Sequence, residues 1–165
     1  MELSIKSVLY FSTIILTGLS AGFFVAWQVS VIPGTLKVTD SVYMSTMQSI
    51  NRAILNPTFF TIFFGSNLLL ALSSIYLFNG DRMAFWWMLF ATVTYLLGTL
   101  GVTALGNVPL NDQLDLLNLA EMPDESLQEF RKYYEIKWNR LHLIRTIFSV
   151  LSFILALGSL LNIPR

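Results

Sequence analysis

Three long stretches without a charged residue constrain this chain most strongly. They cover residues 8–32, 57–78 and 83–105, and a fourth apolar stretch at residues 143–163 begins in a more polar segment. An α-helix rises about 1.5 Å per residue, so about 20 consecutive apolar residues cross the hydrocarbon core of a bilayer. The sequence therefore predicts four membrane-spanning helices, the first of which ends at Pro33-Gly34.

Composition agrees with a protein that lies in a membrane. Charged residues make up 12% of the chain and apolar residues 55%, whereas soluble domains carry about 25% charged residues. We expect one domain over residues 1–165, an all-α, multi-pass integral membrane four-helix bundle in the cell (inner) membrane. The net charge is zero, so there is no electrostatic basis for binding nucleic acid. The expected partners are membrane lipid and a lipophilic small molecule; an oligomer is neither indicated nor excluded.

Two longer connections between the apolar stretches have the pattern of amphipathic helices. Between residues 40 and 55, apolar side chains recur at helical spacing opposite a polar face. Residues 123–137 repeat this pattern, and Pro123 followed by two acidic residues makes a favourable first turn. No break separates this segment from the last apolar stretch, so the two can form one long helix. The short turn at residues 79–82 places both amphipathic connections on one side of the membrane.

Basic residues leave the orientation of the chain open. The two longer connections carry most of them, and a positive-inside count places these connections in the cytoplasm. The same connections also hold most of the acidic residues. Lys6, directly before the first apolar stretch, favours the opposite orientation.

Two amide side chains fall within the first two apolar stretches. Gln28 lies near the end of the first stretch, and Asn67 lies inside the second. Polar side chains at membrane depth are costly, so each needs a hydrogen-bond partner or a ligand. Hydrogen bonds between helices would satisfy both, and Gly18 and Gly22 mark a face on which helices pack closely. For Gln28, contact with a ligand is the alternative.

Three polar segments adjoin the longer connections and therefore lie at one membrane face. They cover residues 51–57, 106–111 and 138–146. The third segment begins a helix face with residues at intervals of four, three and four: Trp138, His142, Arg145 and Ser149. A histidine, two arginines, several asparagines and a tryptophan thus converge at one end of the predicted bundle. This convergence indicates a functional site.

Each polar segment also has a structural interpretation. Asparagine caps helices well and proline ends them, so Asn56-Pro57 and Asn107-Val108-Pro109 would mark helix boundaries. Arg52 and Arg145 would reach lipid headgroups or pair with acidic residues of the connections. His142, the only histidine of the chain, would then be a hydrogen-bonded structural residue.

Several strings in and around these segments form a specific combination. They are Gly22-Phe23-Phe24, Pro33-Gly34, Gln48-Ser49-Ile50-Asn51-Arg52-Ala53-Ile54-Leu55-Asn56-Pro57, Gly106-Asn107-Val108-Pro109-Leu110-Asn111, and Trp138-Asn139-Arg140 with Arg145-Thr146. Together they resemble the anthrone oxygenase family, a large group of small four-helix membrane proteins, over residues 16–157. Named members of that family convert anthrones to anthraquinones and are regarded as cofactor-independent. The resemblance therefore implies a cofactor-independent oxygenase that acts on an anthrone-like, apolar phenolic substrate.

Such chemistry needs a base, hydrogen-bond donors for an anionic oxygen, and a dry pocket. An anthrone that loses a proton from carbon becomes an anion that can give an electron directly to O₂. His142 is the expected base, because imidazole in water titrates near neutral pH. We expect Arg52 and Arg145 to donate to the enolate oxygen and Trp138 to stack on the ring system. The remaining expected contacts with the substrate are amides: Gln28, Asn51, Asn56, Asn107, Asn111 and Asn139.

The alternative function is a non-enzymatic membrane protein that binds a small amphiphile, a quinone or a partner protein at the same face. Replacing His142 separates the two, because turnover needs a base and binding does not. One histidine and no cysteine exclude a histidine-rich or thiolate metal site, and the acidic residues show no ligand spacing. We therefore expect neither a metal nor a cofactor. The sequence also lacks a glycine-rich phosphate loop and a nucleophile elbow.

Overall fold

A computed structural model describes residues 4–162, in which helices are the only regular secondary structure. The predicted all-α class with four long apolar helices is confirmed. Ile163, the predicted end of the fourth apolar stretch, lies outside the described residues. In chain order the α-helices and π-helical segments (η) are α1 (Ile5–Ala26), η1 (Trp27–Val31), α2 (Ile32–Thr35), α3 (Asp40–Ala53), α4 (Pro57–Leu77), α5 (Arg82–Thr94), η2 (Tyr95–Gly101), η3 (Thr103–Asn107), α6 (Val108–Asp115) and α7 (Asp124–Leu161).

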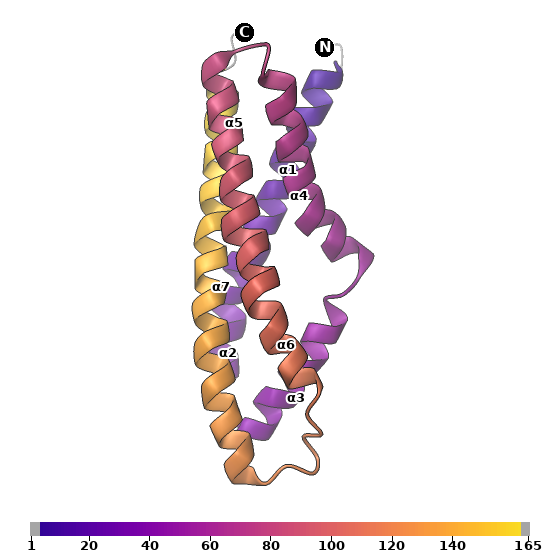
Figure 1. Cartoon of the computed structure of the whole chain (residues 1–165), viewed down its shortest axis with the longest axis vertical. Helices are drawn as coiled ribbons and strands as arrows, with labels where there is room; N and C mark the ends of the chain where they lie inside the picture. Colours follow the sequence, from indigo (N-terminus) through magenta and orange to yellow (C-terminus); the bar gives the residue numbers. More distant parts are fainter. Residues whose placement is uncertain (1–3, 163–165) are drawn as a thin grey trace.

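Four helical stretches are long and apolar enough to cross a membrane. They are Ile5–Thr35, Pro57–Leu77, Arg82–Asp115 and Asp124–Leu161, so the last includes the amphipathic segment in one continuous helix. α1 packs against α4 and α7, and α5 packs against the same two helices, so the four stretches form a ring. The start of α1 and the end of α7 lie at one end of this ring, and α3 lies at the opposite end against α6 and α7 (Figure 1).

Two helices continue through prolines at which the sequence predicted a boundary. α2 extends the first helix past Pro33, and α6 extends the third past Pro109. Proline lacks an N–H, and its ring crowds the carbonyl four residues earlier, which disrupts an ordinary α-helix. A π-helical segment precedes each proline, and in the first the N–H of Ile32 donates to the carbonyl of Trp27, five residues back. These wider turns accommodate the prolines, so the helices continue.

Small side chains fill the contacts between the long helices. The hydroxyl oxygens of Thr13 and Ser73 lie 2.9 Å apart between α1 and α4, and the Ser152 hydroxyl donates to the Ala91 carbonyl at 2.8 Å. Small hydroxyl residues let apolar helices approach closely, and these hydrogen bonds pair groups that would be costly if left alone. The interior of the ring is therefore held by packing and by hydroxyl contacts between helices.

Glycines mark further positions of close approach. A Cβ atom added at Gly98 would lie 2.0 Å from Cγ of Phe148 on α7. Of the predicted pair in the first helix, Gly18 packs on Phe153, because a Cβ atom added there would lie 3.2 Å from the Phe153 ring. A Cβ atom added at Gly22 would have no atom of another helix within 4 Å. Gly18 therefore lies at a helix contact and Gly22 does not.

Arg131 on α7 binds the start of α3 at the end of the ring. Its Nη1 donates to the Asp40 carboxylate and to the Val38 carbonyl, both at 2.8 Å, and its Nε donates to Glu135 at 2.7 Å. The guanidinium also lies over the Tyr43 ring, 4.5 Å from its centroid. Burial, with the nearby Glu135 carboxylate, raises the pKa of the Tyr43 phenol. Tyr43 therefore stays protonated in the apolar core that α3 forms with α6 and α7.

Candidate functional site

A cavity of about 140 Å³, called here the inner cavity, lies where α1, α3, α4, α6 and α7 meet. Most of its lining is apolar, which limits the access of water to the polar groups on its wall. The aromatic lining residues are Phe23, Phe24, Trp27, Phe59, Phe60, Phe63, Phe64 and Trp138. The polar lining residues are Asn51, Thr103, Asn111, His142 and Arg145.

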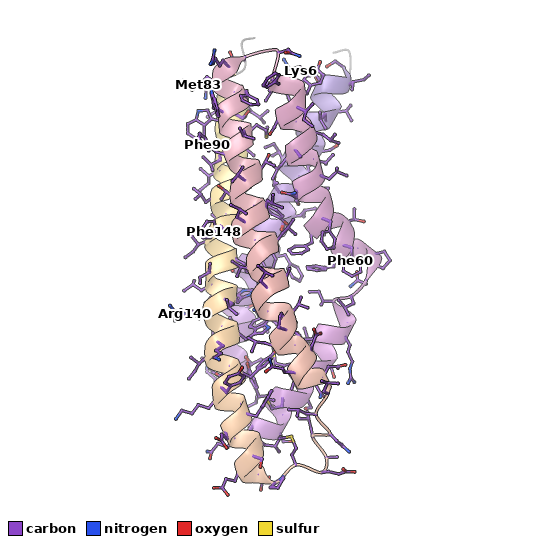
Figure 2. All side chains as sticks on the ribbon, viewed as in Figure 1. Lys6, Phe60, Met83, Phe90, Arg140 and Phe148 are labelled. Carbon is purple, nitrogen blue, oxygen red and sulfur yellow. The ribbon has the colours of Figure 1, made fainter. Side chains whose placement is uncertain are left out.

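A second cavity of about 460 Å³, called here the outer groove, lies between α1 and the corner at which α3 meets α4. It shares six lining residues with the inner cavity, namely Phe23, Phe24, Trp27, Ile50, Ile54 and Phe59. Figure 2 shows Phe60 on the outer side of the same corner, at the start of α4. The two spaces are therefore neighbouring parts of one site that opens sideways between the helices.

Arg145 places a buried guanidinium on the wall of the inner cavity. Only 8% of the residue is exposed. Its Nη2 and Nε atoms lie 2.9 and 3.2 Å from Nδ1 of His142, and its Nη1 donates to the Thr103 hydroxyl at 3.3 Å. Guanidinium nitrogens donate and do not accept, so Nδ1 of His142 is the acceptor. The ring proton of the neutral imidazole is then on Nε2, which donates to the Phe24 carbonyl at 3.1 Å.

The charge of Arg145 has aromatic neighbours and no acidic partner. The guanidinium carbon lies 4.9 Å from the centroid of the Phe24 ring and 5.1 Å from that of Trp138. Within residues 4–162, the ion pairs closer than 4.0 Å all involve other arginines. Cation–π contacts offset part of the cost of burying the charge, but a buried cation without an anion stays unfavourable. This arrangement is complementary to an anionic or electron-rich oxygen in the inner cavity.

Trp138 and His142 form a flat wall beside the guanidinium. Their rings stack at a centroid distance of 5.1 Å and an interplanar angle of 5°. Both belong to α7, four residues apart, so helix geometry alone places them on one face. A planar aromatic ligand can extend this stack.

A hydrogen-bonded chain fixes two amides at the other side of the inner cavity. Asn51 Nδ2 donates to Tyr134 Oη at 3.1 Å, and Tyr134 Oη donates to Asn111 Oδ1 at 3.0 Å. Trp138 Nε1 donates to the same Asn111 oxygen at 2.9 Å. Two donors on one oxygen set the orientation of the Asn111 amide, so its NH₂ group is the part left for a ligand. The Asn51 oxygen is likewise left as an acceptor.

Asn107 contacts the backbone of Trp138 and does not face the inner cavity. Its Nδ2 donates to the Trp138 carbonyl at 3.3 Å, and its Oδ1 is buried without a hydrogen-bond partner among the described residues. Gln28 Oε1 and Asn67 Oδ1 are in the same condition in η1 and α4. None of the three lines the inner cavity or the outer groove.

The structure separates other predicted site residues from the inner cavity. Arg52 pairs with Asp115 at 2.6 Å, and its side chain is 62% exposed. Asn56 accepts from the Phe59 N–H at 3.0 Å as the N-cap of α4, and it lines only the outer groove. Asn139 is half-buried on α7 and lines neither space. The structure thus brings together His142, Arg145, Trp138, Asn51 and Asn111.

Several cavity residues were not predicted as such. Phe24 and Trp27 lie within the first apolar stretch, where aromatic residues look like lipid-facing ones. Tyr134 does not line the inner cavity but holds Asn51 and Asn111, which do, and it falls in the predicted amphipathic segment four residues before Trp138. Thr103 precedes Asn107 by four residues, a spacing that could have indicated a shared polar face.

A family model described as anthrone oxygenase matches residues 58–155. The chain belongs to the anthrone oxygenase family. The matched range holds α4 to α6 and most of α7, and with them His142, Arg145, Trp138 and Asn111. Asn51 and the α1 side of the inner cavity precede it. No curated protein and no solved structure gives a significant match to the chain.

In this member of the anthrone oxygenase family, residues 4–162 contain no group of three or more histidine, cysteine, aspartate or glutamate side chains placed to hold a metal ion. The groups available to a ligand in the inner cavity are therefore a guanidinium, an imidazole, two amides and aromatic faces. These groups suit a planar molecule that carries oxygen atoms at its edge.

Proposed function

We propose that this chain is a membrane-embedded, cofactor-independent oxygenase that binds an anthrone-like, apolar phenolic substrate in the inner cavity. The observation that carries the proposal is the buried guanidinium of Arg145, which has no carboxylate partner among the described residues and faces an aromatic cavity. Membership of the anthrone oxygenase family supports the same chemistry.

Arg145 is the group that stabilises the substrate anion in this proposal. Deprotonating the reactive carbon of an anthrone moves negative charge onto the carbonyl oxygen. A fixed donor in a site with little water stabilises such a charge more than water does, because it needs no reorganisation during the reaction. The same contact gives the buried guanidinium the anion that it lacks, so both partners gain from ionisation of the substrate.

The proposed reaction converts a CH₂ group and O₂ into a carbonyl and water. A base removes one proton from the carbon, and the resulting anion gives one electron to O₂. The substrate radical and superoxide combine to form a C–O bond, and the peroxide takes up a proton. Loss of the second proton from the carbon breaks the O–O bond, which leaves the carbonyl and releases the other oxygen as water. O₂ is the only oxidant that this sequence requires.

His142 is the proposed base, acting through Nδ1. In the structure Arg145 donates to this atom from two nitrogens. A substrate oxygen that takes over these donors leaves the Nδ1 lone pair free to accept the carbon proton. The Phe24 carbonyl, at 3.1 Å from Nε2, stabilises the imidazolium that forms.

A binding protein without catalysis is the second candidate function. The observation that favours it is the hydrogen bonding of His142, whose two ring nitrogens both have partners, so the imidazole is satisfied without a substrate. In that case Arg145 and the amides of Asn51 and Asn111 hold the polar end of a quinone or a similar amphiphile, and no proton is removed.

Turnover of emodin anthrone by the purified protein under air tests the proposal. Anthraquinone absorbance and oxygen uptake are followed for the wild type, Arg145→Gln, His142→Ala and the control Arg140→Gln, which removes an exposed arginine from the same helix. We expect the wild type and Arg140→Gln to exceed spontaneous oxidation, and Arg145→Gln to be slower by about 10²–10³-fold, as when an oxyanion donor is removed. If the wild type matches the blank, the oxygenase proposal fails.

A further inference from the structure

We propose that the ligand of this site has two parts, an oxygen-bearing ring system in the inner cavity and an apolar tail in the outer groove. The inference rests on the proposed function for the position of the ring. It adds a class of substrate, namely alkyl-substituted or prenyl-substituted phenolic rings, and it assigns the outer groove to the tail.

The size of the inner cavity is the first argument. Sites for small molecules enclose about 300–1,000 Å³, and the inner cavity has about 140 Å³. A ligand whose ring system reaches Arg145 therefore fills this space, and any further part of the ligand extends through its mouth. The outer groove, with about 460 Å³, is the space that adjoins this mouth.

The shared lining gives the direction in which the ligand extends. Phe24 and Trp27 line both spaces, and their ring centroids lie 5.9 and 6.3 Å from that of the imidazole. A ring stacked on Trp138 and His142 thus lies beside aromatic residues that also line the outer groove. A substituent that passes these residues enters the groove beside the α3–α4 corner.

The chemistry of the outer groove identifies the substituent as a hydrocarbon. Its two buried or half-buried polar residues already have partners: Ser20 shares a 2.6 Å hydrogen bond with Tyr95, and the Asn56 side chain caps α4 and donates to the Ala53 carbonyl at 2.9 Å. The outer groove has no charged lining residue, and Thr58, its other hydroxyl, is exposed. A polar extension of the ligand would lose hydration there and gain few hydrogen bonds.

The surroundings of the opening identify the source of the ligand as the bilayer. Leu55 and Phe64, which line the inner cavity, are 68% and 54% exposed beside the α3–α4 corner. Apolar side chains of this size belong in lipid on a chain with four long apolar helices. Lipid tails are as apolar as the groove, so moving the ligand tail from lipid into the groove adds little affinity. The groove therefore accommodates a tail without favouring tailed ligands over ligands that lack one.

A substitution that fills the outer groove tests the inference. Ala53 lines the groove but not the inner cavity, and Ala53→Phe places a ring in the path of the tail. Ala104→Phe is the matched control, because Ala104 is exposed and lines neither space. The full chain is placed in phosphatidylcholine nanodiscs, and the binding of dihydroxyanthraquinone is compared with that of a homologue that carries a decyl chain. Concentrations are expressed per lipid, which removes the effect of partitioning.

We expect the wild type and Ala104→Phe to bind both compounds with similar affinity. Ala53→Phe should bind the compound without a tail normally and the decyl homologue at least about tenfold more weakly, since a side chain and a tail compete for one space. Equal effects of Ala53→Phe on both compounds, or no effect on either, would overturn the inference. Selective weakening in a protein that does not turn over anthrones would support the two-part ligand and reject the oxygenase proposal. Failure of the wild type to bind either compound would reject both.

Discussion

The guanidinium of Arg145 donates to one atom of His142, Nδ1, from both Nη2 at 2.9 Å and Nε at 3.2 Å. This contact makes the two residues a single unit within α7. It fixes the tautomer of the imidazole, and it holds the guanidinium against the inner cavity without a carboxylate. A substrate that takes the guanidinium donors at the same time frees the histidine. Ligand binding and activation of the base are therefore coupled in this account.

Replacing His142 with alanine should separate binding from turnover. We expect His142→Ala to bind a dihydroxyanthraquinone within a few-fold of the wild type and to oxidise anthrone at least about 100-fold more slowly, the usual effect of losing a general base. Leu143→Ala, an exposed position on the same helix, serves as the control. Rates at saturating substrate and dissociation constants measure the two effects. A variant that loses binding and keeps its rate would contradict the role of His142 as a base.

Removing the Tyr134 hydroxyl should release the amides of Asn51 and Asn111. Tyr134→Phe deletes two hydrogen bonds inside the protein, each worth about 1 kcal/mol, so it should lower the unfolding temperature and raise KM more than it lowers kcat. Tyr133→Phe is the matched control, because Tyr133 is exposed and its hydroxyl makes only a 3.4 Å contact with Gln113. If both variants raise KM equally, the amides do not contact the substrate.

Gly98 should be intolerant of any side chain. A Cβ atom at this position would lie 2.0 Å from Phe148, so Gly98→Ala forces η2 away from α7. The substitution should lower the free energy of unfolding by about 1–3 kcal/mol or more. Gly22→Ala makes the same change in a helix where no neighbour lies within 4 Å, and it should be tolerated. Thermal unfolding in detergent compares the two. Equal stability would mean that the close contact between these helices is absent in solution.

Loss of Arg131 should loosen α3 without unfolding the long helices. Arg131→Gln removes the ion pairs with Asp40 and Glu135 and the bond to the Val38 carbonyl. We expect amide hydrogen exchange in α3 to accelerate, whereas exchange in α4 stays slow, because local opening reports local contacts. Lys132→Gln changes an adjacent exposed residue and should leave both unchanged. Unaltered exchange in α3 would show that its other contacts, including the Asn51–Tyr134 hydrogen bond and the Arg52–Asp115 ion pair, hold this helix without Arg131.

The fold could be predicted from the sequence because charge-free stretches of this length have few other solutions. The amphipathic spacing of residues 40–55 likewise predicted α3, and the uninterrupted pattern after Pro123 allowed for the length of α7. The continuation of two helices through Pro33 and Pro109 could not be foreseen. It depends on π-helical segments, which leave no simple periodic signal in the sequence.

The site could be predicted only in part, since spacing along one helix is visible in a sequence and contacts between helices are not. Trp138, His142 and Arg145 share a face of α7, and the structure places them together. Arg52 looked equivalent to Arg145, but Asp115 lies within its reach and pairs with it at the surface. Which arginine keeps a carboxylate partner is decided by tertiary packing, and so is the placement of Phe24 over the guanidinium.

The most direct test of the central claim is the ionisation state of an anthrone bound without oxygen. The absorption spectrum of emodin anthrone is recorded anaerobically near neutral pH with the wild type, Arg145→Gln and Arg140→Gln. The account predicts that the wild type and Arg140→Gln bind the compound as its anion, and that Arg145→Gln binds it in the neutral form. A neutral spectrum in the wild type, or an anionic one in Arg145→Gln, would contradict the claim that Arg145 stabilises the substrate anion.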